Sequence, residues 1–203
     1  NLGLKLSYEP LQYLNKHCKD RHQGIIALIK IPKLPDESDL KNDIAQIETP
    51  FILILDNIED PRNLGACLRS ADAAGIDLVI IPKHKSASLT PVAKKTAAGA
   101  ADSLTIYQVT NIVNALEILK DNGVWIAGAD CDGDSKSIYQ LDLCGSLGIV
   151  LGNEGKGIRP LVKKHCDFML HIPMFGTVPS LNVSVATGII LFEANRQRKN
   201  IIT

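Results

Sequence analysis

Two loop segments in the C-terminal third carry the residues best suited to contact a ligand. The first, residues 152–157, reads Gly-Asn-Glu-Gly-Lys-Gly and directly follows the apolar stretch 147–151. The second runs from 172 to 184 and contains Ser180 and Asn182, either of which can cap the helix that follows. Glycines allow close backbone approach, and loops at the carboxyl ends of neighbouring parallel strands are where α/β proteins bind ligands. The two segments therefore predict a single site, into which free backbone N–H groups point.

Two familiar nucleotide-binding motifs do not fit the glycine-rich segment. A phosphate-binding P-loop has four residues between its glycines and a hydroxyl residue after the lysine, whereas only two residues separate Gly152 from Gly155, and Lys156 is followed by Gly157. A dinucleotide fingerprint would open the first strand–helix turn, where residues 60–65 read Asp-Pro-Arg-Asn-Leu-Gly. The segment thus predicts a different kind of ligand site.

Some polar residues near these loops also have a simpler interpretation. Asn63, Asn153 and Ser184 are of types that cap helices or stabilise turns, and a purely structural role explains them equally well. Glu154 is an acid between glycines at the end of a strand, and Arg69 interrupts a helix rich in Ala and Leu. These two residues are therefore the stronger functional candidates.

The elements that must position these residues alternate between apolar strands and amphipathic helices. Strands are predicted at 51–56, 77–82, 104–109, 124–129, 147–151 and 168–172. Helices are predicted from Asn63, as N-cap, to Gly75, around 92–98, from Asn111, and from Asn182 to about Arg198. This alternation predicts an α/β fold with a parallel sheet flanked by helices.

The N-terminal region has a different pattern, with a helix predicted from Glu9 to about His17 and a strand over 24–30. We interpret residues 1–33 as a partial N-terminal α+β segment, 34–50 as a linker and 51–203 as the main domain. One helix and one strand do not close a core, so this segment is expected to need a preceding portion of chain or a partner. Residues 16–23 are dense in Lys, Arg and His, as in a solvated loop or a phosphate-contacting surface.

The composition restricts the class of protein. The 22 basic and 22 acidic residues cancel, so any attraction for a polyanion must come from a local cluster. Five cysteines are scattered without a C-x-x-C pair, which favours reduced thiols over a metal site. No apolar run has the length of a membrane span, so we expect a soluble cytoplasmic protein with no membrane contact.

The chain carries three ordered motifs: Asn63-Leu-Gly-Ala-Cys-Leu-Arg69, Leu151-Gly-Asn-Glu-Gly-Lys-Gly-Ile158 and Ser180-Leu-Asn-Val-Ser-Val-Ala-Thr-Gly188. They resemble the motifs of the SpoU (TrmH-like) branch of the SPOUT RNA methyltransferases. The resemblance extends over residues 51–198 and is closest to the bacterial enzymes that methylate a guanosine 2′-hydroxyl in 23S ribosomal RNA.

This resemblance implies that residues 1–33 are part of an N-terminal RNA-binding domain, whose end residues 22–27 resemble, and that residues 51–203 are a SpoU methyltransferase domain. It also implies a C-terminal trefoil knot, a homodimer whose active site uses residues of both subunits, an RNA substrate, and S-adenosylmethionine as methyl donor with no metal. The residues it assigns to the methyl donor are Gly152, Ile172 and Leu181. The residues it assigns to catalysis are Asn63, Arg69, Glu154, Ser180 and Asn182.

The role of Arg69 has two interpretations, a proton acceptor or an electrostatic stabiliser of the developing alkoxide. The second is favoured because a guanidinium has a pKa above about 12. Glu154 and Asn63 would then orient this arginine and the ribose. Two other functions are compatible with the sequence: a transfer-RNA ribose methyltransferase of the same branch, or a non-catalytic RNA-binding factor in ribosome assembly. The intact Arg69, Glu154 and Asn182 argue against the latter.

Overall fold

The computed structural model describes residues 5–19, 22–28, 33–130 and 134–199. Its contacts divide the chain into two compact units, Asn1–Lys33 and Leu34–Thr203. In the first unit, α1 (Leu11–His17) confirms the predicted helix. The predicted strand over 24–30 is wrong for residues 24–28, which form no strand, and its last two residues lie outside the described ranges. Ile25 and Leu28 are exposed, and among the described residues no strand pairs with this segment.

The second unit is built on a seven-stranded sheet in which every described pairing is parallel, as predicted. The strand order is β3-β2-β1-β6-β4-β7-β5. The bounds are β1 (Phe51–Leu55), β2 (Leu78–Pro82), β3 (Thr105–Val109), β4 (Trp125–Ala129), β5 (Lys136–Ser137), β6 (Leu147–Leu151) and β7 (Phe168–His171). The short edge strand β5 was not predicted, because two residues are too few to show an alternation of apolar and polar side chains.

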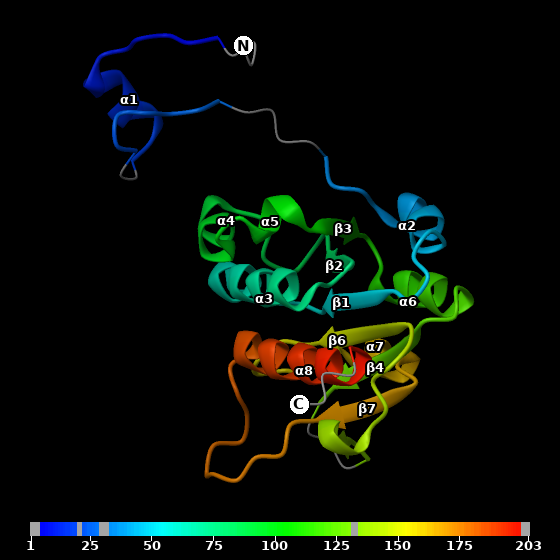
Figure 1. Cartoon of the computed structure of the whole chain (residues 1–203). Helices are drawn as coiled ribbons and strands as arrows, with labels where there is room; N and C mark the ends of the chain where they lie inside the picture. The colour runs from blue at the N-terminus through cyan, green and yellow to red at the C-terminus, as the bar shows by residue number, and fades with distance from the viewer. Residues whose placement is uncertain (1–4, 20–21, 29–32, 131–133, 200–203) are drawn as a thin grey trace. The chain divides into compact units, whose positions relative to one another are not determined.

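Helices cover both faces of this sheet (Figure 1). One face carries α3 (Pro61–Ala74), α4 (Pro91–Ala97), α5 (Ala100–Ser103) and α8 (Val183–Arg198), and the other α2 (Glu37–Ile44), α6 (Ile112–Asp121) and α7 (Pro160–His165); a 3₁₀ turn, Ile138–Gln140, follows β5. Alternate residues of β1 enter the two separate cores. All five residues of this strand are buried, as expected of a central parallel strand. No helix in the described ranges is both long and apolar enough to cross a membrane.

The helix ends confirm three predicted signals and correct one. Gly75 ends α3 in the left-handed conformation with φ 69°, and Asn111 and Asn182 cap α6 and α8. The expectation that Asn63 caps the first helix of the main domain is wrong. Asp60 accepts a hydrogen bond from the backbone N–H of Arg62, and α3 begins at Pro61, a residue favoured at the first helical position. Asn63 therefore lies within the first turn and its side chain is available for other contacts.

Residues 34–44, which fall in the stretch interpreted as a linker, belong to the second unit and pack against its sheet. Leu40 and Ile44 of α2 are buried, and the Tyr107 hydroxyl donates a hydrogen bond to the Asp43 carboxylate. The carbonyl of Pro35 accepts a hydrogen bond of 2.9 Å from the backbone N–H of Gln108 at the edge strand β3. These contacts make α2 a cover for the sheet rather than a free connection.

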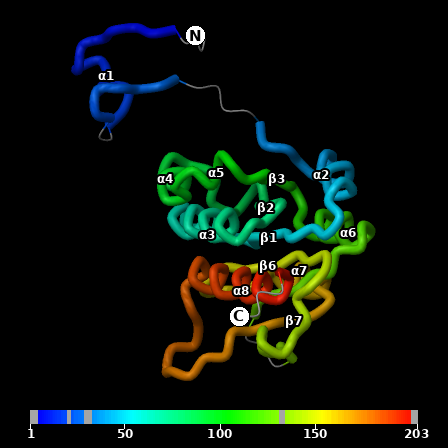
Figure 2. The backbone as a smooth tube through the Cα atoms, in the orientation of Figure 1, coloured from blue at the N-terminus to red at the C-terminus, as the bar shows by residue number. Residues whose placement is uncertain are grey.

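The two loops expected to form a site follow β6 and β7, and these strands are not neighbours, contrary to the sequence-based expectation. β4 lies between them in the sheet. Figure 2 shows the long orange connection that leaves β7 and returns as α8. The site is therefore built on three strand ends, and the residue that follows β4 is placed between the two loops.

Candidate active site

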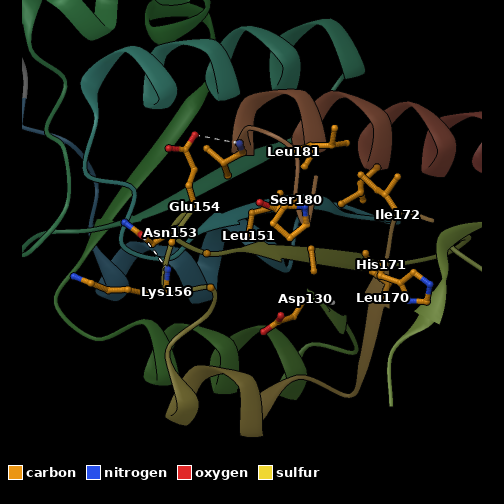
Figure 3. A pocket seen from close by; sticks show the side chains of 18 of the residues that line it. Asp130, Leu151, Asn153, Glu154, Lys156, Leu170, His171, Ile172, Ser180 and Leu181 are labelled. Atoms are coloured by element: carbon orange, nitrogen blue, oxygen red, sulfur yellow. Dashed lines mark hydrogen bonds between the residues drawn. The ribbon is translucent and has the colours of Figure 1, made fainter. Parts of the chain in front are cut away.

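A cavity of about 350 Å³ opens at the carboxyl ends of β4, β6 and β7. The glycine-rich loop after β6 forms one wall, and the connection between β7 and α8 forms another (Figure 3). Its size is within the usual range for a small-molecule site. The lining residues are Ala129, Asp130, 151–157, 170–172, Met174, 179–181, Val183, Ala186 and Ile190.

The glycine-rich loop is a tight turn held by its own backbone. Asn153 and Gly157 exchange two backbone hydrogen bonds of 3.0 and 2.8 Å, and Asn153 Oδ1 accepts from the N–H groups of Gly155 and Lys156. Gly157 has φ 65°, which favours glycine. A Cβ on Gly152 would overlap the backbone of Gly157. Asn153 therefore has the structural role considered for it, and Gly152 is required for the loop to close on itself.

Glu154 accepts hydrogen bonds from two asparagines of the other predicted motifs. Its Oε1 atom accepts from Asn63 Nδ2 at 2.7 Å, from Asn182 Nδ2 at 2.6 Å and from the backbone N–H of Val183 at 3.3 Å. Asn182 Nδ2 also lies 3.1 Å from Asn63 Oδ1. One residue from each of the three motifs thus meets at a single carboxylate oxygen, although they are up to 119 positions apart in the sequence.

The predicted residues occupy three kinds of place. Five of them line the cavity: Gly152, Glu154, Ile172, Ser180 and Leu181. Asn63 and Asn182 do not line it but bond to Glu154. Arg69 is exposed on α3, is not a lining residue, and makes no side-chain hydrogen bond or ion pair within the described parts of the chain.

Asp130 is a cavity residue that the sequence reasoning missed. It follows β4 directly, lines the cavity, and forms an ion pair of 3.1 Å with Lys163 of α7. Its side chain is largely buried, with 19% exposed. The rule applied to the other two loops, that ligands meet the carboxyl ends of parallel strands, would have identified Asp130 had the position of β4 been known.

An ion pair between Asp56 and Arg159, which the sequence patterns did not indicate, fixes the C-terminal end of the glycine-rich loop. The Asp56 carboxylate, fully buried after β1, accepts from the backbone N–H of Arg159 at 2.9 Å and from its Nε at 2.7 Å. A third contact of 2.6 Å joins the guanidinium to the same carboxylate. A buried carboxylate must be paired, so Asp56 and Arg159 fix the chain where it leaves the loop and enters α7.

Cys67 belongs to the first motif but is not a nucleophile. It is fully buried, its Sγ lies 3.3 Å from Thr187 Oγ1 of α8, and burial raises the pKa of its thiol to about 11. At pH 7 the thiol therefore stays protonated. Within the described ranges, no three His, Cys, Asp or Glu side chains are grouped so as to hold a metal ion.

A model of the SpoU rRNA Methylase family matches residues 50–192. The chain belongs to this family. The match contains all three motifs and every strand of the sheet.

Two SpoU relatives are similar over almost the whole chain. The 23S rRNA (guanosine-2′-O-)-methyltransferase RlmB of Photorhabdus laumondii is 47% identical over 201 residues, which cover 98% of this chain and 82% of the relative. The protein of the same name from Escherichia coli K12 is 49% identical over 197 residues, 97% of this chain and 81% of the relative.

Solved SpoU structures share the fold. AviRb from Streptomyces viridochromogenes, in complex with the cofactor AdoMet, matches with a TM-score of 0.74 and 28% identity over 84% of this chain and 67% of that chain. The A. aeolicus TrmH/SpoU tRNA modifying enzyme matches with a TM-score of 0.68 and 31% identity, over 81% of this chain and 84% of that chain. These matches confirm the predicted α/β fold.

Proposed function

We propose that the chain transfers a methyl group from S-adenosylmethionine to the 2′-hydroxyl of a guanosine in 23S ribosomal RNA. The observation that carries the proposal is the meeting of Asn63, Glu154 and Asn182 at the edge of the cavity. The names of the relatives support the ribosomal substrate and the guanosine, and the AdoMet complex of AviRb supports the donor.

The cavity has the features that the methyl donor needs. Part of its lining is apolar and includes Leu151, Ile172, Leu181 and Ile190, which suits an adenine ring. The glycine-rich loop lines the cavity partly with backbone, because Gly152, Gly155 and Gly157 are lining residues without side chains. Asp130 adds a carboxylate that can accept hydrogen bonds from ribose hydroxyls or an ammonium group.

The methyl donor and the protein contribute different parts of the reaction. S-adenosylmethionine supplies a methyl group already activated by its positive sulfur. The protein must hold the ribose oxygen in line with that methyl group and favour loss of the hydroxyl proton. We assign the orientation of the ribose to Ser180 and to the Glu154 network, and the stabilisation of the developing negative oxygen to Arg69.

We further propose that Arg69 acts in the site of a partner subunit within a homodimer. Arg69 is exposed and outside its own chain's cavity lining, so a second copy can place it beside a different cavity. A surface for such a copy exists on α8, where Val185 and Phe192 are 49% and 52% exposed on one side of the helix. The C-terminal trefoil knot, in which the last helix is threaded through a loop, also remains part of this proposal.

Methyl transfer to defined RNAs tests the function. The chain would be incubated with methyl-labelled S-adenosylmethionine and an unmodified 23S rRNA transcript, with a mixture of transfer-RNA transcripts in parallel. The expected product is 2′-O-methylguanosine in the ribosomal transcript after digestion to nucleosides. Label only in transfer RNA would favour the second substrate class, and label on a base would refute ribose chemistry.

A further inference from the structure

A basic loop lies at the same edge of the sheet as the cavity and has no role in the site described above. Residues 83–85, Lys-His-Lys, follow β2 directly and are all exposed. Within the described parts of the chain, none of the three side chains makes a hydrogen bond or an ion pair. The loop therefore presents two positive charges and an imidazole to solvent.

Hydrogen bonds at both ends hold the backbone of this loop in one conformation. The backbone N–H of Lys83 donates to the carbonyl of Val109 at 2.8 Å. Two groups at the other end, Ser86 Oγ and the N–H of Ala87, donate to the carbonyl of Ile58 at 2.9 and 2.7 Å. Lys85 between them adopts φ 57°, a left-handed conformation that a lysine rarely takes. Such a conformation persists only where the surroundings fix it, so the backbone that carries the two lysines is held in place.

The loop is also close to the cavity. β2 pairs with β1, and β1 pairs with β6, so the ends of β2 and β6 are two strand spacings apart, roughly 10 Å. Residues 57 and 58 connect the two loops by hydrogen bonds. The carbonyl of Ile58 accepts from the basic loop, and the carbonyl of Asn57 accepts from Asn153 Nδ2 at 3.3 Å. The basic loop is thus separated from the glycine-rich wall of the cavity by residues 57–58.

The acids along this edge are already engaged. Glu59 is 3.6 Å from Lys156, Asp60 caps α3, and Glu154 accepts its three hydrogen bonds. A chain with no net charge overall therefore carries, at residues 83–85, two lysines that pair with no acid within the described ranges.

We infer that Lys83 and Lys85 bind backbone phosphates of the RNA next to the nucleotide that is methylated. The inference rests on the proposed function for the identity of the polyanion. Cations carried on this fixed loop would help to position the ribose without reading sequence, because phosphate contacts fix register and base contacts give specificity.

The test compares a double variant, Lys83→Gln with Lys85→Gln, with a matched control, Lys164→Gln with Lys199→Gln. Lys164 and Lys199 are exposed lysines near the ends of α7 and α8, at the opposite edge of the sheet, where Arg198 donates to the carbonyl of Thr49 just before β1. Both variants lose two charges. Binding of the whole chain to a 23S rRNA transcript would be measured across a salt series, and binding of S-adenosylhomocysteine would report an intact fold.

For the Lys83/Lys85 variant we expect the dissociation constant for the transcript to rise about tenfold at physiological salt, and the salt slope to fall by about 1 to 2. Unchanged RNA affinity and slope in this variant would overturn the inference and leave the proposed function intact. An equal loss in the control variant would overturn it too, by showing a diffuse charge effect. Failure of the wild-type chain to bind the transcript would overturn both.

Discussion

Asn182 Nδ2 donates a hydrogen bond of 2.6 Å to Glu154 Oε1, while its Oδ1 accepts from the N–H of Ser184 and caps α8. A single side chain therefore joins the first turn of the C-terminal helix to the glycine-rich loop. The position of the Glu154 carboxylate depends on this cap, which links the stability of α8 to the geometry of the site.

The two functions of Asn182 can be separated by two substitutions. Asn182→Ala removes both the cap and the amide donor, so the free energy of unfolding should fall by about 1 kcal/mol. Asn182→Ser keeps an oxygen that can cap the helix but has no amide to reach Glu154, so stability should stay close to that of the wild type. Both variants should lose methyl transfer to a similar extent. Full activity in Asn182→Ser, measured beside urea unfolding, would show that the bond to Glu154 is not used.

Substitution by alanine should destabilise the chain at Gly152 but be tolerated at Gly155. A Cβ at Gly152 would overlap the backbone of Gly157 and Ile158, so Gly152→Ala must open the loop, and overpacking of this kind costs about 1–3 kcal/mol. The nearest atom to a Cβ at Gly155 is 3.7 Å away, so Gly155→Ala should be tolerated. Thermal unfolding of the two variants would check this, and equal destabilisation of both would contradict the described loop.

Cys67 should make stability fall at alkaline pH. Its thiol has a pKa of about 11 in the folded chain against 9.0 for an unperturbed thiol, because burial disfavours the thiolate. Between these values the unfolded chain binds fewer protons than the folded chain, so stability decreases as pH rises, by roughly 2–3 kcal/mol in total. Below pH 9 this contribution is fully present.

The matched variant for this prediction is Cys67→Ser, which keeps a small polar side chain beside Thr187 and does not titrate in this range. The fall in the free energy of unfolding between pH 9 and 11 should be smaller in this variant than in the wild type. Parallel curves for the two proteins would mean that Cys67 does not contribute.

Mixing two inactive variants would test which subunit supplies Arg69 to each active site. Arg69→Ala and Glu154→Ala should each abolish most methyl transfer alone. If each site takes Arg69 from one subunit and Glu154 from the other, subunit exchange creates mixed dimers with one intact site, and activity should recover to about one quarter of the wild-type value. No recovery after exchange would place both residues in the same subunit.

The sequence predicted the elements well where the signal is local. The apolar runs at 51–55 and 147–151 are central strands because they are covered on both faces, and Gly75 and Asn182 end and begin helices through their own chemistry. It failed where the outcome depends on a competing neighbour: Pro61 shifted the start of α3, which released Asn63 from its expected cap to bond with Glu154.

Local sequence patterns did not predict the order of the strands in the sheet or the packing of distant elements. Nothing in the sequence of β4 places it between β6 and β7, so Asp130 was overlooked as a cavity residue. The docking of α2 depends on a hydroxyl of Tyr107, 64 positions away from Asp43. Of the eight candidate residues, five line the cavity and two more donate hydrogen bonds to Glu154.

Calorimetric titration with S-adenosylhomocysteine would show whether the cavity between the two loops holds the methyl donor. We expect saturable binding by the wild-type chain, no comparable binding of ATP or NAD, and loss of binding in Leu181→Arg, which places a charge in the apolar lining. Absence of binding by the folded wild-type chain, or binding that Leu181→Arg leaves unchanged, would contradict this assignment.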